Sequence, residues 1–354
     1  MNRLEEINFK HDQIRALLER RQADSLWLRR TRNLAWITAG ADASIPVDAD
    51  YGAYSVLLTR DKRVVYTTNI EATRLHAEEA FEALGFEYVE YPWHQPTAPA
   101  NALLDDGEVE SDIQRLRWVL NAGEIERCRA LGKDTAAALD EAIRAIRPGD
   151  TEFQLAARLD AACRARGGLA AVNLIGTDER ISRFRHPKPT DKRLEKYAMI
   201  VVCMRREGLI LSATRLAHFG ALPPELREKA AKVAAIDAAA IAASRPGRSL
   251  GDVFADLQAA YAAQGETDQW LYHHQGGPTG YIARERVATP GDPTIISANM
   301  ALAWNPSIVG CKSEDTILVN ESGFEIVTAA PAGWPMIAVE IGGQTIQRPG
   351  ILEL

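Results

Sequence analysis

Apolar residues in the first part of the chain alternate between the spacing of short helices and that of short strands. Apolar positions three or four apart predict a helix over residues 1–22, a short helix within 31–38 and another at Glu71–Leu84. Runs rich in Val, Leu and Tyr between them predict strands at Ser25–Leu28, Tyr54–Leu58, Val64–Thr68 and Phe86–Tyr91. Strands that alternate with helices in this way predict a small α/β layer domain.

The pattern changes after the segment from Pro92 to about Glu110, whose prolines and acidic residues are typical of a linker. Beyond it, long periodic segments and short apolar runs predict a second domain that mixes packed helices with antiparallel strands. The predicted helices are Ala122–Ile146, Thr151–Arg166, Pro224–Ala243 and Leu250–Gln264, and the predicted strands are Met199–Cys203, Leu209–Ser212, Met300–Trp304, Thr316–Asn320 and Phe324–Thr328. The expected fold class is therefore α+β.

Composition says little about the fold, but it excludes some classes of function. The 354 residues are 46% hydrophobic and 25% charged, which is ordinary for a globular protein of two domains. A net charge of -7 leaves no basic surplus for nucleic acid, and we expect no nucleic-acid partner. No apolar stretch reaches the roughly 20 residues that span a bilayer, and the N-terminal segment is a charged amphipathic helix. We expect a cytoplasmic protein without a membrane partner.

The four cysteines predict neither a zinc site nor a disulfide framework. Cys128, Cys163, Cys203 and Cys311 are widely spaced and form no close pair. We interpret them as buried free thiols. Cys311 lies beside the motif described next, so a nucleophilic role for it stays open.

The most informative segment is Trp304-Asn305-Pro306, which is followed by the acidic run at residues 312–316. It is the sixth and seventh of seven segments that occur in order: EIE (124–126), RPGDTE, RHPKPTDKRL, GLILSATRLAHFG, HHQGGPTGY, ALAWNPSIVG and KSEDTILVNESGFEIVT. In this order they resemble the M24 family of creatinase, aminopeptidase P, prolidase and methionine aminopeptidase. The resemblance implies a creatinase-type α/β domain at residues 1–110 and a catalytic domain of pita-bread fold at 111–354.

The resemblance also identifies the positions at which the family binds two divalent metal ions. The family uses two aspartates, one histidine and two glutamates, which suit a bridged metal pair. Here these positions hold Val201, Ser212, Gly277, Asn305 and Glu314, and Pro278 replaces Gly277 if His274 rather than His273 is the first histidine of the motif. A valine cannot bind a metal, and a lone carboxylate does not hold a divalent pair. We therefore predict no catalytic metal and no other cofactor.

Creatinase itself works without metal, and its catalytic histidine corresponds to His186. By this resemblance His186 is the general base, which takes a proton from water and returns it to the leaving nitrogen. Glu314 and His274 are the other predicted catalytic residues. The alternatives are structural: His186 as an ordinary loop histidine, and Glu314 as a partner of Lys312 or Arg215.

Residues expected to hold the substrate surround these three. Adjacent residues on an extended segment face opposite ways, so one of His273 and His274 is expected to face the pocket. Arg284 can clamp a carboxylate or pair structurally with Glu285. Arg32, or alternatively Arg30, is expected to act across a dimer interface. The full predicted set is His273, Ser212, Arg215, His218, Gln275, Tyr281, Arg284, Asn305 and Arg32.

We therefore expect a homodimeric, metal-independent hydrolase of a C–N bond in a small guanidino, amidine or amide compound. Three alternatives stay open. The scaffold can carry a lyase or isomerase that uses His186 for proton transfer. It can carry a metallopeptidase of the Xaa-Pro type with rearranged ligands. It can also be a binding protein without catalytic activity.

Overall fold

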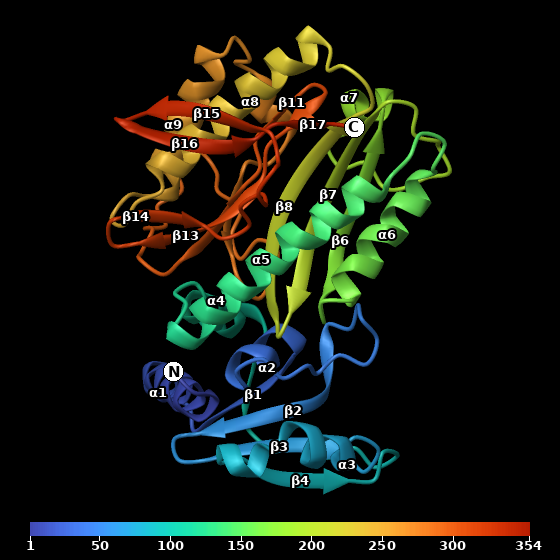
Figure 1. The fold of residues 1–354 in the computed structure, drawn as a ribbon. Coiled ribbons are helices and arrows are strands. Elements are labelled where there is room, and N and C mark those ends of the chain that lie inside the picture. The colour runs from blue at the N-terminus through green and yellow to red at the C-terminus, as the bar shows by residue number, and fades with distance from the viewer. The chain divides into compact units, whose positions relative to one another are not determined.

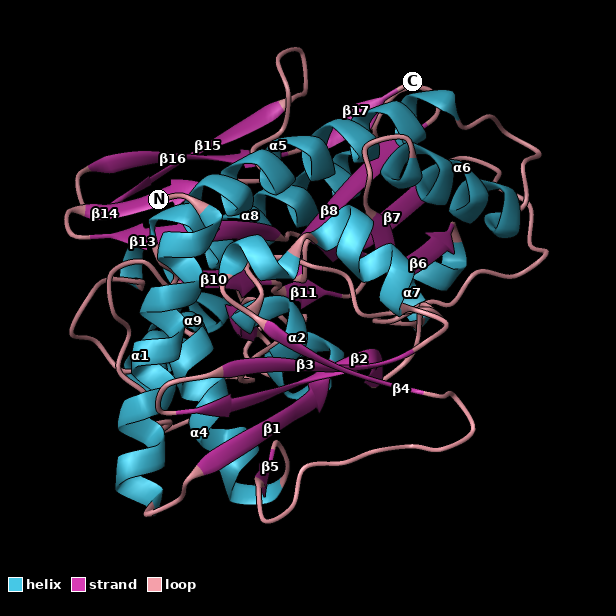
Figure 2. Cartoon of the chain, turned by 90° about the horizontal axis from the view of Figure 1, so that it is seen from below, coloured by secondary structure: helices cyan, strands magenta, loops and turns pink.

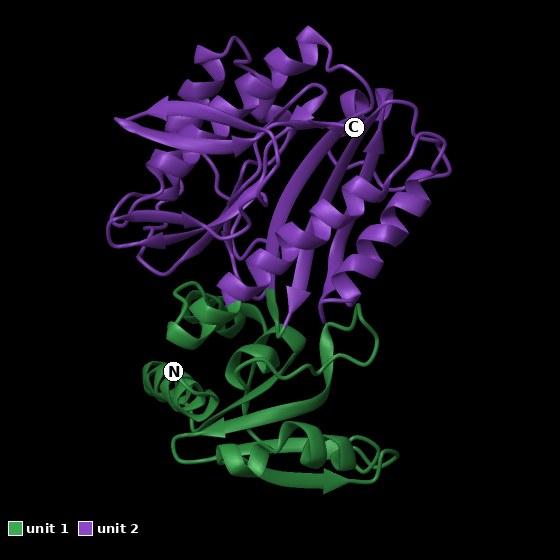
Figure 3. Cartoon of the chain, in the orientation of Figure 1, with its two compact units in different colours: residues 1–127, 207–209 green, residues 128–206, 210–354 purple.

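The computed structural model describes residues 1–354 and divides into two compact units. One unit holds residues 1–127 and 207–209, and the other holds residues 128–206 and 210–354 (Figure 3). The division falls inside the long helix α5 (Ala122–Ala145). The domain boundary expected after residue 110 stays a prediction.

The first unit is built on a five-stranded sheet with strand order β4-β3-β2-β1-β5. Strands β1, β2 and β3 pair antiparallel, whereas β4 and β5 each run parallel to their neighbour. Helix α1 begins at a capping box in which Asn2 and Glu5 bond each other's backbone N–H. The elements are α1 (Arg3–Arg21), β1 (Ser25–Arg30), α2 (Thr31–Ile37), β2 (Tyr51–Thr59), β3 (Arg63–Thr68), β4 (Glu87–Tyr91), β5 (Leu103–Leu104) and α4 (Gly107–Arg117).

The single helix predicted over residues 71–84 is wrong. The chain forms a short α3 (Ala72–Arg74), a π-helical turn (Leu75–Glu79) and a 3-10 turn (Phe81–Leu84). Ala80 separates the turns with a φ of 49°, which ends the helical path. Phe81 is fully buried after this break and its ring contacts that of Phe86. Tertiary packing has overridden the local helical pattern.

The segment interpreted as a linker is also partly wrong, because its second half belongs to the sheet. Strand β5 pairs with β1, and helix α4 begins at Gly107. Asp105 is fully buried, and its carboxylate accepts hydrogen bonds from the backbone N–H groups of Arg29 and Arg30 at 2.9 and 2.8 Å. A buried carboxylate with such partners ties the segment to the sheet.

In the second unit, α5 and α6 (Glu152–Arg164) lie along the sheet that contains β6, β7 and β8 (Figure 1). Helices α8 (Pro224–Ala243) and α9 (Leu250–Ala263) pack against each other, and α8 also packs on β15 and β16. The alanine-rich sequence of α8 allows this close approach. Smaller helical elements are α7 (Glu179–Arg183) and a 3-10 turn (Gln269–Tyr272). None of the helices combines the length and the apolarity needed to cross a membrane.

Two four-stranded sheets, ordered β17-β8-β7-β6 and β14-β13-β10-β9, form the frame of this unit (Figures 1 and 2). Hydrogen bonds between β8 and β13 join them: the Ser212 N–H donates to Thr316 Oγ1, and the Thr214 N–H donates to the carbonyl of Glu314. The strands are β6 (Leu169–Thr177), β7 (Tyr197–Arg206), β8 (Leu209–His218), β9 (Gly276–Thr279), β10 (Ala301–Trp304), β11 (Ser307–Ile308), β12 (Cys311–Lys312), β13 (Asp315–Asn320), β14 (Gly323–Ile326), β15 (Met336–Ile341), β16 (Gln344–Pro349) and β17 (Ile351–Glu353).

Strands β6, β9, β15, β16 and β17 were not predicted, and β7 and β8 are longer than predicted. The sequence GGPT of β9 contains two glycines and a proline, which disfavour a strand when read alone. Nevertheless, β9 pairs with β10 because its glycines allow a close backbone approach: a Cβ at Gly276 would lie 2.0 Å from the carbonyl oxygen of Ala303. The register therefore depends on a tertiary contact.

A buried cluster of charges lies behind the seam between the sheets. Arg348 on β16 is fully buried and pairs with Asp237 of α8 at 2.6 Å and with Asp315 of β13 at 2.8 Å. Asp315 also pairs with Arg215 of β8 at 2.9 Å. Burial raises the pKa of the Asp237 carboxyl, although Arg348 lowers it. The cluster connects α8, β8, β13 and β16 through ion pairs that water does not screen.

We predict that Arg348→Met lowers the free energy of unfolding by roughly 3–5 kcal/mol, because it leaves the buried Asp237 without a cation and Asp315 with Arg215 alone. Arg227→Met is the matched control, since Arg227 pairs with Glu353 at the surface, and it should change stability by less than about 1 kcal/mol. Urea denaturation of both variants measures the difference. Equal losses would show that the buried cluster does not stabilise the fold.

Candidate functional site

A cavity of about 330 Å³ opens beside the seam between the two sheets. Its wall combines apolar side chains from β6 and β7 with polar side chains from several loops. The lining residues are Val172, Leu174, His186, Val201, Cys203, His274, Ala283, Arg284, Asn305, Lys312 and Glu314. Four predicted site residues from distant parts of the sequence, together with His186, therefore meet at one cavity.

One carboxylate between two cations forms the floor of this cavity. Glu314 directly precedes β13, Lys312 ends β12, and Arg284 lies in the loop after β9. Lys312 Nζ and Arg284 Nη2 each lie 2.8 Å from one oxygen of Glu314. We call these three residues the ion triad. All three side chains are at most 10% exposed, so the charges interact in a weakly screened environment.

Hydroxyl groups complete the coordination of the ion triad. Thr214 Oγ1 donates to Glu314 at 2.7 Å, and Ser212 Oγ accepts from Arg284 Nη1 at 3.0 Å. Burial raises the pKa of Glu314, but Lys312 and Arg284 outweigh it and lower that pKa to about 2. Glu314 is therefore ionised at neutral pH, and both of its oxygens are already bonded. The triad keeps one positive charge that no other carboxylate in the cavity wall balances.

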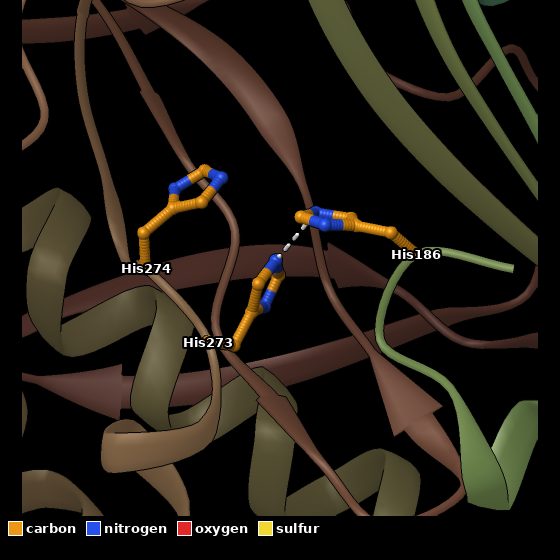
Figure 4. A group of neighbouring side chains, drawn as sticks. All are labelled: His186, His273 and His274. Carbon is orange, nitrogen blue, oxygen red and sulfur yellow. Dashed lines mark hydrogen bonds between the residues drawn. The ribbon is translucent and has the colours of Figure 1, made fainter.

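Three histidines, His186, His273 and His274, lie together (Figure 4). Two of them, His186 and His274, line the same cavity as the ion triad. His273 Nε2 and His186 Nε2 are 3.0 Å apart, and His273 Nδ1 lies 2.9 Å from Ser307 Oγ. A hydrogen bond between two ring nitrogens needs one proton and one lone pair. We call His186 and His273 the histidine pair. It holds one proton between its rings and favours states in which at least one ring is neutral.

Loss of solvation and the neighbouring cations lower the pKa of all three imidazoles, of which His186 is the most exposed. Burial and then Lys312 lower the pKa of His186, although Glu314 opposes this, and they place the pKa of His273 far below its usual value. Burial, followed by Arg284, lowers the pKa of His274 to about 4. Neutral imidazole accepts protons at neutral pH, as a general base must.

Three buried polar atoms at the cavity have no hydrogen-bond partner within the protein: Asn305 Oδ1, His274 Nδ1 and Arg284 Nε. Asn305 is 2% exposed. Buried polar atoms are normally paired, so these three are the polar atoms of the cavity region that still lack a partner. Arg284 supplies a donor and Asn305 an acceptor, which together suit a small polar molecule with both kinds of group.

A second cavity of about 480 Å³ shares His186 and His274 with the first. Phe254, Trp270 and Tyr272 give it an aromatic wall, and the rings of Phe254 and Trp270 meet edge to face. Arg185 is its only lining cation. The histidines therefore lie between a small cavity with the ion triad and a larger aromatic one.

Several residues predicted to bind substrate do not line these two cavities. Arg215 is buried in the ion pair with Asp315, and His218 bonds the Gly220 carbonyl. Tyr281 is buried, and Gln275 accepts from the hydroxyl of Tyr261. Arg32 belongs to the first unit, where it pairs with Glu110 and Asp50. Their proposed roles toward a substrate stay predictions.

Sequence reasoning missed Arg185 and Ser307 and treated Lys312 as structural only. Arg185 directly precedes His186 in the sequence, so its charge beside a predicted catalytic residue could have indicated a role in the site. Ser307 gave no signal, because its contact with His273 depends on the turn after β10. The expected structural pair of Arg284 with Glu285 is replaced by the pair with Glu314.

The residues at the five metal positions do not fit a divalent metal pair. Val201 offers no ligand atom, and Glu314 already carries two cations. Gly277 has a φ of 143°, and a Cβ there would lie 2.3 Å from the Arg286 carbonyl oxygen, so the backbone leaves no room for a histidine. A different set does suit one metal ion, because His186, His273 and His274 bring ring nitrogens within 4.8 Å of one another.

The chain is similar to known peptidases over most of its length. The model of metallopeptidase family M24 matches residues 126–321. An uncharacterized peptidase of Staphylococcus aureus (strain MW2) is 21% identical, over 88% of this chain and 96% of the relative. The prolidase from Pyrococcus horikoshii OT3 superposes with a TM-score of 0.75 at 18% identity, over 92% of this chain and 99% of that one.

The Xaa-Pro dipeptidase from Bacillus anthracis gives a TM-score of 0.76 at 16% identity, over 98% of this chain and all of that one. Likeness at this identity concerns the fold, and it confirms the expected pita-bread architecture with its preceding α/β domain. It gives no support to the metal-free, creatinase-like detail of the prediction. The similar proteins are named as peptidases, which favours the metallopeptidase alternative.

We predict opposite effects of two substitutions in the ion triad on the titration of His186. Lys312→Met removes a cation and should raise the pKa of His186, whereas Glu314→Gln removes the anion and should lower it further. NMR titration of the histidine ring protons, with His186→Asn to assign the signal, measures both. If Lys312→Met does not fold, Arg284→Met should also raise the pKa. Shifts of the same sign in both variants would contradict the electrostatic account.

Proposed function

We propose that this chain, which belongs to metallopeptidase family M24, hydrolyses an amide-type C–N bond in a small polar compound. The coarse class is a peptidase-like hydrolase of that family. The observation that carries the finer proposal is the position of the histidine pair beside an ion triad with one uncompensated positive charge. A base and a cationic site at one cavity are the two groups that amide hydrolysis requires.

The proposed reaction begins when His186 takes a proton from a water molecule that attacks the carbonyl carbon. The carbonyl oxygen gains negative charge, which Arg284 and Lys312 stabilise from the floor of the cavity. The C–N bond then breaks, and the proton on His186 passes to the leaving nitrogen. The products are one carboxylic acid and one amine, so one water is consumed and no redox partner is needed.

The histidine pair and Ser307 support the base in this scheme. Ser307 lies at one nitrogen of His273, and the other nitrogen faces His186. This arrangement fixes the ring of His273 and thereby orients His186, as a third group does in other nucleophile and base systems. His186 is the catalytic residue, and His273 and Ser307 are positioning residues.

Among the expected substrates, the ion triad favours amides over guanidino and amidine compounds. A cationic substrate group would need a free carboxylate, but both oxygens of Glu314 are taken by Lys312, Arg284 and Thr214. The remaining charge of the cavity is positive and attracts a carbonyl oxygen or an anion instead. Glu314 then keeps the two cations in place and does not contact the substrate.

A metallopeptidase with rearranged ligands is the second candidate. The similarity to proteins named as peptidases supports it more than it supports a metal-free enzyme. The specific observation in its favour is the group of three histidines, whose nitrogens suit zinc, copper, nickel or iron. In that case His186, His273 and His274 would hold the ion, and the ion would supply Lewis-acid polarisation and an activated water.

Chelation separates these two candidates. We expect the purified protein to contain substoichiometric metal and to release amine from a panel of small amides and dipeptides equally well with and without chelator. His186→Asn should reduce kcat/KM by roughly 10²–10⁴ through loss of the base. The exposed His94 provides the control, and His94→Asn should leave the rate unchanged.

The second candidate predicts the opposite result. It requires about one equivalent of metal, loss of activity with chelator, and loss of metal from His274→Ala. That outcome would overturn the metal-free mechanism while keeping the C–N hydrolase. No amine release from any amide or peptide would overturn the hydrolase itself.

A further inference from the structure

Arg185 is a cation without a carboxylate partner in the wall of the larger cavity. Its guanidinium donates to Ser307 Oγ at 3.2 Å and to the side-chain oxygen of Gln269, and both acceptors are neutral. Burial lowers the pKa of Arg185, because the charged guanidinium loses part of its hydration at this position. Arg284 and Lys312 in the smaller cavity are, by contrast, already paired with Glu314.

Hydrogen bonds to two neutral side chains, Ser307 and Gln269, hold the guanidinium of Arg185 beside the histidine pair. Ser307 Oγ lies within hydrogen-bond distance of both Arg185 and His273, and Arg185 directly precedes His186 in the chain. A planar guanidinium in a fixed position is suited to bidentate recognition of a carboxylate. A carboxylate bound there has the aromatic wall of Phe254 and Trp270 next to it.

The smaller cavity differs in what it accepts. Val172, Leu174 and Val201 line it with apolar surface. Its only carboxylate is Glu314, which is already paired with Lys312 and Arg284. A free ammonium group would meet the positive charge of the ion triad without an anion to balance it, which is unfavourable. An uncharged acyl group with its carbonyl oxygen toward Arg284 avoids this cost and fits the apolar wall.

We propose that the substrate is an N-acyl amino acid with an apolar or aromatic side chain. Its α-carboxylate binds Arg185, its side chain lies against Trp270, and its acyl group occupies the smaller cavity. The amide bond then crosses between the cavities at His186, where both meet. This inference rests on the proposed hydrolase function and names its substrate class. Water adds to the acyl carbon, and the free amino acid leaves with the proton from His186.

Binding can be measured apart from turnover in the His186→Asn variant. The probes are N-acetyl-L-phenylalanine, its C-terminal amide and L-alanyl-L-phenylalanine, each titrated into the full chain by calorimetry. N-acetyl-L-phenylalanine should bind roughly tenfold to hundredfold more tightly than its amide, as expected for a charge-assisted pair. It should also bind at least about tenfold more tightly than the dipeptide, whose ammonium group meets the ion triad.

Arg185→Met in the same background should abolish the preference for the acid over its amide. The matched control is Arg183→Met, because Arg183 is an exposed arginine two residues away, and it should keep the preference. Equal binding of the acid and the amide to the protein with Arg185 intact would overturn the inference, even if Arg185→Met does not fold. So would tighter binding of the dipeptide than of the N-acetyl compound.

Failure of this inference is distinguishable from failure of the proposed function. Hydrolysis of amides by the unmodified enzyme without preference for a carboxylate overturns the substrate class and leaves the hydrolase standing. Selective binding of N-acetyl-L-phenylalanine that depends on Arg185, without release of phenylalanine or any other amine by the unmodified enzyme, leaves the binding site and overturns the hydrolase.

Discussion

The rest of the site depends on the attraction between Glu314 and its two cations. Lys312 and Arg284 each lie 2.8 Å from this buried carboxylate, where Coulomb interactions are much stronger than in water. The two cations keep Glu314 ionised. Desolvation lowers the pKa of His186, Lys312 and Arg284 lower it further, and Glu314 partly opposes them. The triad keeps one positive charge. This charge favours a carbonyl oxygen or an anion in the cavity over a cationic nitrogen group.

The frame that holds this interaction was only partly predictable from the sequence. Helices α5, α6, α8 and α9 were predicted near their observed bounds, because long amphipathic or alanine-rich periods are local signals. Strand β9 was missed because its glycines and proline oppose a strand locally, and only the approach of β10 makes it one. The C-terminal strands β15, β16 and β17 were not predicted, although β15 alternates between half-buried and exposed positions.

The site itself was predictable where the chain carries family-like motifs. His186, Asn305, Arg284 and Glu314 were selected from the sequence, and the structure brings them to one cavity. What the sequence could not show is which charges pair: Arg284 contacts Glu314, thirty positions away, rather than adjacent Glu285. The contacts of Ser307 with His273 and of Arg185 with Gln269 could not be predicted either, because they form only when the chain folds.

In the proposed mechanism, the two cations of the ion triad take the part that a metal pair plays in polarising a carbonyl group. A divalent pair and a guanidinium with an ammonium both draw a carbonyl oxygen toward positive charge, so the same fold can polarise the same bond. A metal ion also lowers the pKa of its bound water, which side-chain cations do not do. A mechanism without metal must therefore obtain its base from the protein, and in our proposal His186 of the histidine pair is that base. If the three histidines instead bind a metal, the base and the metal cannot both use the same nitrogen of His186.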